Sequence, residues 1–252
     1  MIRPVFEPET LPVIATGAGL PPVAGERLTP DALRARFSRQ LAWTPEKIAD
    51  APWRNPELDP RVAAVLVPLV MRERGLTVLL TQRADHLNDH AGQVSFPGGR
   101  QEPFDADATA TALREAREEV GLDASRVEVL GALPDYLTGT GFCVSPVIAL
   151  VHPPFSLAID TLEVAEVFEV PLAFLMDPAN HEERLFRYEG GERRFFAMPY
   201  PRSELTVASD AAGQRGAQHA QMAASVVVQG GHHFIWGATA AMLRNLYRFL
   251  AA

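Results

Sequence analysis

The sequence is poor in cysteine, with Cys143 as the single one in 252 residues. One cysteine cannot form an intrachain disulfide or a cysteine-based zinc site, so a secreted fold built on disulfides is excluded. No internal repeat is apparent either. Since domains usually hold about 100–200 residues, the length indicates one large domain or a domain with an extension.

Long apolar runs and a basic charge excess are also missing. No stretch approaches the roughly 18–20 consecutive apolar residues of a membrane-spanning helix, and the N-terminus lacks the features of a signal peptide. Because 31 Asp and Glu outnumber 23 Lys and Arg, giving a net charge of −8, a nucleic-acid-binding surface is disfavoured. We expect a soluble cytoplasmic protein without nucleic-acid or membrane partners. A local cation or metal still permits a small anionic substrate.

Proline is dense at the start of the chain, and we expect residues 1–60 to form an N-terminal extension that packs on a main domain of residues 61–252. Within the extension, Thr29 as N-cap, Pro30 at the first helical position and apolar residues at helical spacing predict a helix over residues 30–48. Residues 203–224 are rich in Ala, Ser, Gly and Gln without a period, which predicts an inserted loop.

Between these segments, strand and helix patterns alternate. Two apolar runs around a turn at residues 72–75 predict a hairpin of buried strands. Further strands are predicted near residues 127–133, 144–151 and 164–170, and an aromatic-rich hairpin around residues 190–191. Helices are predicted over residues 106–120, ending at Gly121, and over residues 237–250.

The helix predicted over residues 106–120 carries three carboxylates on one face, because Glu115, Glu118 and Glu119 stand at i, i+3 and i+4. An apolar stripe on the same helix would seat it against a sheet and leave the carboxylates projecting to one side. Like charges at this spacing repel one another, and clustered carboxylates suit hard cations such as Mg²⁺. The alternative is a solvated acidic face with Arg114 and Arg117 as local partners.

The segment GRQEPFDADATATALREAREEVGL, residues 99–122, resembles the signature of the Nudix hydrolases. Its second half, REAREEVGL, fits that signature with Ala116 in an aliphatic position. Its first half departs in two ways: Asp105 stands where glutamate is usual, and eight residues rather than seven separate it from Arg114.

A second segment, LLTQRADHLNDHAGQVSFPGG at residues 79–99, is similar to the signature of the coenzyme A pyrophosphatase branch of this superfamily. Every fixed position matches except Asn88, which occupies an arginine position. The longer first half with its aspartate also looks like that branch, as do TGTGFCVSPVIALV and HFIWGATAAMLRNL further along the chain. The resemblance covers roughly residues 62–252, apart from residues 203–224.

This resemblance implies an α/β (α+β) fold, in which a mixed β-sheet and helices form an α/β/α sandwich with a catalytic loop-helix-loop, plus the N-terminal extension. It implies metal-dependent hydrolysis of the diphosphate of coenzyme A or its derivatives to 4′-phosphopantetheine, or its acyl form, and adenosine 3′,5′-bisphosphate. Two alternatives remain: a Nudix hydrolase of ADP-ribose, NADH or a nucleotide sugar, and a non-catalytic binding protein with this fold. A homodimer is left open.

The resemblance also implies the roles of individual residues. Glu115, Glu118 and Glu119 would bind Mg²⁺ or Mn²⁺ with help from the Gly98 carbonyl, and together with Arg114 they would form the catalytic set. Arg114 is expected to orient a glutamate rather than to contact the substrate.

The general base has three candidates, because Nudix enzymes draw it either from the signature helix or from a later loop. Glu115 is the candidate on the helix, and Glu163 and Glu166 are the later ones. A reading of the two later glutamates as surface charges beside a strand is equally compatible with their positions.

Binding of coenzyme A calls for a cation near its 3′-phosphate. Arg83 is the first candidate because arginine suits bidentate phosphate contact, followed by His86 and then His90. Gly98 and Gly99 would let the backbone approach the ligand closely. Several other residues are more typical of structural positions than of ligand contacts: Phe96, Phe142, Trp236, His232 and His233.

Overall fold

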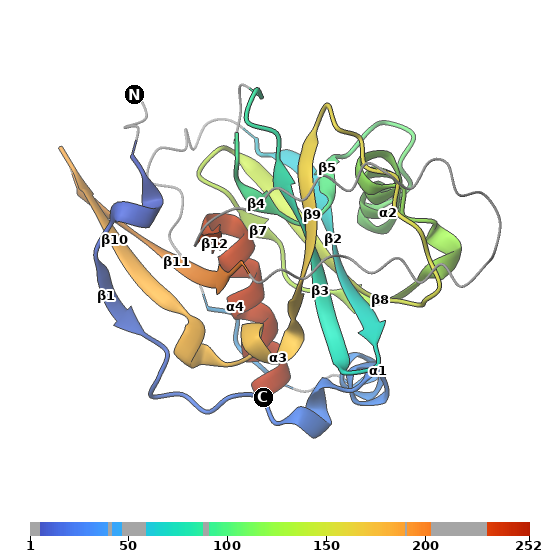
Figure 1. The fold of residues 1–252 in the computed structure, drawn as a ribbon, viewed down its shortest axis with the longest axis horizontal. Helices are drawn as coiled ribbons and strands as arrows, with labels where there is room; N and C mark the ends of the chain where they lie inside the picture. The colour runs from blue at the N-terminus through green and yellow to red at the C-terminus, as the bar shows by residue number, and fades with distance from the viewer. Residues whose placement is uncertain (1–5, 40–41, 47–58, 88–90, 190, 203–230) are drawn as a thin grey trace.

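The computed structural model describes residues 6–39, 42–46, 59–87, 91–189, 191–202 and 231–252 (Figure 1). The α-helices in these residues are α1 (Pro30–Ser38), α2 (Ala108–Val120), α3 (Leu172–Leu175) and α4 (Gly237–Ala251). Short 3₁₀ helices cover Pro8–Thr10, Gly25–Leu28, Ala124–Arg126 and Pro178–Asn180. None of the described helices has the length and apolar character that crossing a membrane requires.

The strands form two sheets. The larger sheet has the order β4-β3-β2-β8-β6, with β5 and β7 pairing to β2 and β8 and with β9 pairing to β3. The smaller sheet has the order β1-β10-β11-β12. The strand bounds are β1 (Val13–Thr16), β2 (Arg61–Arg72), β3 (Gly75–Arg83), β4 (Val94–Ser95), β5 (Gly98–Arg100), β6 (Val127–Ala132), β7 (Tyr136–Leu137), β8 (Phe142–Val151), β9 (Val164–Pro171), β10 (Glu182–Tyr188), β11 (Gly191–Pro201) and β12 (His232–Trp236).

The larger sheet is mixed, as expected. β2 and β3 form the predicted antiparallel hairpin, whereas β2 and β8 run parallel over ten paired residues from Arg61 to Val70. Parallel pairing needs a long crossover connection, and the segment that contains α2 provides it. The helix that carries the glutamates is therefore fixed against the centre of the sheet.

Both faces of the larger sheet are buried, which explains the continuous apolar runs of its strands. Along β8, Val147 and Ala149 face the core beneath α2, whereas Ile148 and Leu150 face the second core, to which α4 and the smaller sheet contribute. Figure 1 shows α2 and α4 on opposite sides of the sheet. The layered α+β architecture expected from the sequence is confirmed.

The N-terminal residues contact several parts of this framework. β1 pairs with the outer edge of β10, and Leu33 of α1 is fully buried in the core that contains α4. These contacts are what packing on a main domain requires, although the division of the chain at residue 60 stays a prediction. The loop predicted over residues 203–224 lies outside the described residues.

The predicted helix over residues 30–48 is shorter in the structure. Thr29 caps it as predicted, with its hydroxyl accepting a hydrogen bond from the Ala32 N–H at 3.3 Å. The helix ends at Ser38, Arg39 is extended, and residues 42–46 are not helical. Pro45 also argues against a helix that continues through residue 44, because the residue before a proline disfavours the helical conformation, but it does not explain the end at Ser38.

Candidate active site

Helix α2 is held by local signals at both of its ends. The Asp107 carboxylate accepts a hydrogen bond from the Ala110 N–H at 2.8 Å, and Gly121 ends the helix in a left-handed conformation with φ of 70°. Glycine adopts that conformation without steric cost. Because both ends of α2 are fixed, the positions of its three glutamates relative to β5 and to the loop that follows β5 are also fixed.

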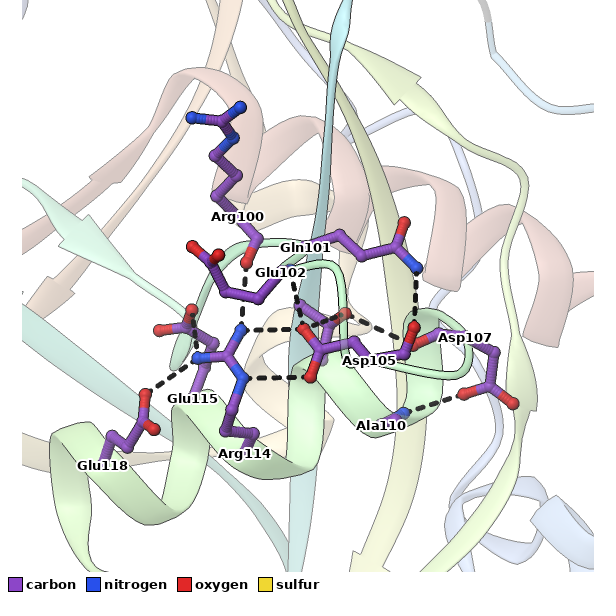
Figure 2. A network of polar contacts seen from close by, with 10 residues as sticks. Arg100, Gln101, Glu102, Asp105, Asp107, Ala110, Arg114, Glu115 and Glu118 are labelled. Carbon is purple, nitrogen blue, oxygen red and sulfur yellow. Dashed lines mark hydrogen bonds and ion pairs between the residues drawn. The ribbon is translucent and has the colours of Figure 1, made fainter.

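Arg114 is the centre of the polar network in Figure 2. Its Nε and Nη2 donate to the two oxygens of Asp105 at 3.0 and 2.9 Å, and Nη2 also donates to the Arg100 carbonyl at 3.0 Å. Its Nη1 donates to Glu115 Oε1 at 2.9 Å and to Glu118 Oε2 at 2.8 Å. One guanidinium therefore holds three carboxylates and one carbonyl, as its planar set of five donors allows.

The network stabilises the charged forms of Asp105 and Arg114. Hydrogen bonds from Arg114 and from the Glu102 N–H hold the pKa of Asp105 well below its usual range, while the Asp105 carboxylate raises the pKa of Arg114. Both groups therefore keep their charges across the physiological pH range. The sequence prediction that Arg114 orients a glutamate agrees with its contacts to Glu115 and Glu118, but catalytic roles for these residues stay predictions.

Glu119 is buried, with a side chain that is 6% exposed. Its Oε2 accepts a hydrogen bond from the Gly98 N–H at 3.1 Å, and its Oε1 lies 3.9 Å from Arg83 Nη1. Burial raises the pKa of Glu119 to about 7, against the lowering effect of the Gly98 N–H. The sequence did not show that Glu119 is buried, since its burial depends on the contact with Gly98 of β5.

Glu115 is also partly buried. Burial raises the pKa of its carboxyl group, and the hydrogen bond from Arg114 lowers it. A Cβ added at Gly99 would lie 2.5 Å from the Glu115 carboxylate, so glycine is needed there for the carboxylate to pack against β5. A Cβ at Gly98 would lie 2.5 Å from the Ala64 carbonyl oxygen on β2. Gly99 therefore leaves space for a side chain of α2, whereas Gly98 leaves space for the backbone of β2.

No group of three His, Cys, Asp or Glu within the described residues has an arrangement ready to hold a metal ion. The reason lies in the contacts above: Arg114 binds Glu115 and Glu118, and the Gly98 N–H binds Glu119. The donor set nonetheless fits a hard divalent cation, because all three side chains offer carboxylate oxygens. Glu119 fits in particular, since burial raises the pKa of its carboxyl even though Arg83 lies 3.9 Å away, and a bound cation would favour the charged form.

The two later glutamates have different surroundings: Glu163 is in the turn before β9, and Glu166 is within β9. Glu163 is exposed, and its charge raises the pKa of Glu115 and Glu119 further, in addition to the effect of burial. Glu166 instead lies 3.5 Å from Arg202 Nη2 and 3.7 Å from His233 Nε2, on the side of the smaller sheet. Only Glu163 therefore accompanies the carboxylates of α2.

Of the predicted substrate-binding residues, the structure brings Arg83 close to the carboxylates. Arg83 ends β3, and its buried Nε has no hydrogen-bond partner among the described residues. His86 is exposed in the following turn. Asn88 and His90 lie outside the described residues. Gly98 and Gly99 start β5, next to Glu119 and Glu115 as described.

Sequence reasoning missed one polar cluster, which lies where β3, β9 and β12 meet the end of β11. Arg202 Nη2 donates to Gln82 Oε1 at 2.8 Å, and the His233 ring stacks on Phe168 with a centroid distance of 3.6 Å. Burial lowers the pKa of His233 to about 4, which supports the structural reading of this histidine. No motif marked Arg202. Phe96 is 2% exposed and belongs to the core, as its pattern favoured.

Comparison with known proteins gives a consistent result. A family described as NUDIX domain matches residues 60–184. Proteins named uncharacterized Nudix hydrolase NudL from Enterobacter sp. (strain 638) and from Salmonella newport (strain SL254) are 36% and 38% identical to this chain over 190 residues, which is 75% of this chain and 82% of each relative. The crystal structure of a Nudix hydrolase from M. smegmatis, RenU, covers 46% of this chain and 73% of its own, at 24% identity and a TM-score of 0.39, and no inference below depends on it.

Proposed function

The chain belongs to the Nudix hydrolase family, and from that premise we propose that it hydrolyses the diphosphate of coenzyme A or of its derivatives. The products would be 4′-phosphopantetheine, or its acyl form, and adenosine 3′,5′-bisphosphate. The motif LLTQRADHLNDHAGQVSFPGG, which is similar to the signature of the coenzyme A branch, is the basis for this choice of substrate.

The observation that carries the proposal is the contact between the end of this motif and the carboxylates of α2. Gly98 donates its N–H to Glu119, and Gly99 leaves the space that the Glu115 carboxylate fills. Arg83, from the start of the same motif, lies beside Glu119. A segment typical of one substrate class therefore surrounds the glutamates that the family uses for chemistry.

We assign the metal site to Glu115, Glu118 and Glu119. Mg²⁺ or Mn²⁺ bound there would neutralise charge on the diphosphate and polarise the attacking water. Glu118 is well placed to leave Arg114, because its side chain is 59% exposed. Asp105 fixes Arg114, and Arg114 in turn orients Glu115 and Glu118, so Asp105 is a positioning residue. Arg83 would bind a phosphate group of the substrate, for which a guanidinium is suited.

Product analysis tests the proposal. Purified protein with Mg²⁺ or Mn²⁺ is incubated with coenzyme A, acetyl-coenzyme A, ADP-ribose, NADH and a nucleotide sugar, and the products are separated by chromatography. Release of phosphopantetheine or its acetyl form, with a kcat/KM at least tenfold above that for the other substrates, supports the proposal. Release of AMP from ADP-ribose or NADH without phosphopantetheine assigns the alternative substrates instead.

The Glu119→Gln variant tests the metal assignment separately. Loss of a metal ligand that stabilises the transition state by several kcal/mol should lower kcat by about 100-fold or more. Glu192→Gln, at an exposed glutamate at the start of β11, is the matched control and should keep wild-type activity. Full activity of Glu119→Gln on every substrate would show the assignment to be wrong. Binding without turnover of any substrate would favour the non-catalytic alternative.

A further inference from the structure

A cavity of about 300 Å³ lies on the side of the larger sheet that faces away from α2. It is open to solvent on one side and is lined by the end of β1 and the residues that follow it, by the smaller sheet and by α4. The lining residues that matter here are Gly19, Glu46, His181, Glu183, Phe196 and Arg244. Arg244 belongs to HFIWGATAAMLRNL, one of the later stretches that look like the coenzyme A branch, but none of the six residues lies in the segments of residues 79–99 and 99–122 or in the candidate active site. The proposed diphosphatase activity therefore assigns no role to this cavity.

Arg244 presents an unused donor to the cavity. The residue is 5% exposed, its Nε donates to Glu46 Oε2 at 2.9 Å, and its Nη1 donates to His181 Nδ1 at 3.1 Å. Its guanidinium carbon lies 5.2 Å from the centroid of the Phe196 ring. Within the described residues Nη2 has no hydrogen-bond partner. Nη2 is not among the fully buried atoms that lack a partner in the described residues, so it is accessible from the cavity that Arg244 lines, where it can donate to a ligand.

His181 fixes the direction of this guanidinium. Its Nε2 donates to the Leu175 carbonyl at 2.7 Å, which leaves Nδ1 as the acceptor for Arg244. Burial lowers the pKa of His181 to about 4, so the ring is neutral near pH 7 and adds no charge to the wall. Glu46 and His181 therefore fix Nε and Nη1 of Arg244, and Nη2 remains available to a ligand.

The same wall also offers unused acceptors. Both arginine contacts of Glu46, from Arg244 and from Arg248, involve Oε2, which leaves Oε1 without a partner in the described part of the chain. Glu183 meets Arg194 through Oε1 at 3.4 Å, and its Oε2 likewise has no described partner. Each carboxylate is paired with arginine, Glu46 with Arg244 and Arg248 and Glu183 with Arg194, so charges of both signs lie at this wall. A partly desolvated site of this kind penalises a ligand with a net charge.

We propose that this cavity binds a small zwitterion of the α-amino acid class. The ligand carboxylate would accept from Arg244 Nη2, and its ammonium group would donate to the free oxygens of Glu183 and Glu46. Phe196 and Leu20 supply the apolar part of the wall. The volume lies at the lower end of the range of small-molecule sites, as such a compact ligand requires.

Calorimetric titration of the full chain tests the proposal. The probes are the α-amino acids, the 2-oxo acids that keep the carboxylate alone, and the primary amines that keep the ammonium alone. At least one amino acid should bind saturably, at least tenfold tighter than its oxo-acid and amine counterparts. Absence of binding by every amino acid, or equal binding by an oxo acid or an amine, overturns the proposal. Because binding is measured without turnover, the result is independent of the substrate of the active site.

Two variants locate the site. Glu183→Gln keeps the side-chain shape and removes its charge, so it should weaken binding about tenfold or more. Gly19→Leu adds a side chain at a position where a Cβ meets nothing within 4 Å, and should block the cavity. Gly25→Leu is the matched control, since its Cβ also meets nothing within 4 Å and Gly25 lies outside the cavity wall. Binding that persists unchanged in both cavity variants would place the ligand elsewhere and contradict the proposal.

Discussion

Arg114 and Asp105 form a two-point salt bridge, with Nε 3.0 Å from Oδ1 and Nη2 2.9 Å from Oδ2. Asp105 is also fixed by the Glu102 N–H at 2.9 Å and the Thr111 hydroxyl at 3.0 Å. The family signature usually has glutamate here, one residue nearer to the arginine. Asp105 contacts Arg114 at two points in spite of both departures, so the arginine keeps a carboxylate partner.

The salt bridge predicts the effect of Asp105→Asn. The amide cannot accept both arginine contacts, so Arg114 loses its fixed orientation and no longer holds Glu115 and Glu118. Loss of such a supporting partner usually costs about 10- to 100-fold in activity or metal affinity. We expect a drop of that size in kcat/KM together with a higher Mg²⁺ concentration for half-maximal activity. Glu102→Gln, on the same loop and exposed, should change neither quantity, and an unaltered Mg²⁺ dependence of Asp105→Asn would contradict the positioning role.

Gly98 and Gly99 should respond differently to alanine. At Gly98 the added Cβ meets the backbone of β2, which cannot move easily, and we expect a loss of about 1–3 kcal/mol in the free energy of unfolding, measured by urea denaturation. At Gly99 the Cβ meets the flexible end of Glu115. Gly99→Ala should therefore unfold close to the wild-type urea concentration and lose activity instead. The opposite ranking of the two stabilities would disprove this account.

The positions of Glu163 and Glu166 predict which can serve as general base. Glu166 lies with Arg202 and His233 on the face opposite α2, so Glu166→Gln should keep kcat within about twofold of the wild type. A general base contributes about 10² to 10⁴ in rate. If Glu163 is the base, Glu163→Gln should lower kcat by that factor, and if kcat is unchanged the role passes to Glu115. A large loss of kcat in Glu166→Gln, with Glu163→Gln unaffected, would show that Glu166 takes part in catalysis in spite of its position away from α2.

His181 predicts a pH dependence of stability. Its pKa is lowered from 6.5 to about 4 by burial, and Arg244 beside it also disfavours the protonated ring. The unfolded chain therefore takes up a proton between about pH 6.5 and pH 4 while the folded chain does not, so the free energy of unfolding falls as the pH falls through this window. The lowered pKa of His181 corresponds to a contribution of up to about 3 kcal/mol.

The measurement is urea denaturation from pH 7 to pH 4 for the wild type and for His181→Gln, whose amide does not titrate in this range. The variant should show a shallower decline, whatever its stability at pH 7. Part of the decline should remain, because burial lowers the pKa of His233 to about 4 as well. Identical slopes for the two proteins would show that His181 titrates normally in the folded state.

Much of the local structure around the site could be predicted from the sequence. Gly121 marks the end of α2 as predicted, whereas the helix begins at Ala108 rather than at residue 106, and the spacing of Glu115, Glu118 and Glu119 places them on one side of that helix. The hairpin of β2 and β3 follows from two apolar runs around a short turn. These features depend on residues close together in the chain, so their sequence patterns suffice. The predicted helix over residues 30–48 was wrong beyond Ser38, because the spacing of apolar residues does not show where a helix ends.

The sequence by itself determined that three carboxylates lie next to a glycine pair, and which family they resemble. The tertiary structure decided what surrounds each of them. Glu119 is buried because β5 pairs with β2 above it. Glu163, in the turn before β9, acts on the pKa of Glu119, whereas Glu166 within β9 lies beside His233 of the smaller sheet. The cavity beside Arg244 requires segments that are far apart in the chain. Such relationships arise from the pairing of distant strands, which local patterns do not encode.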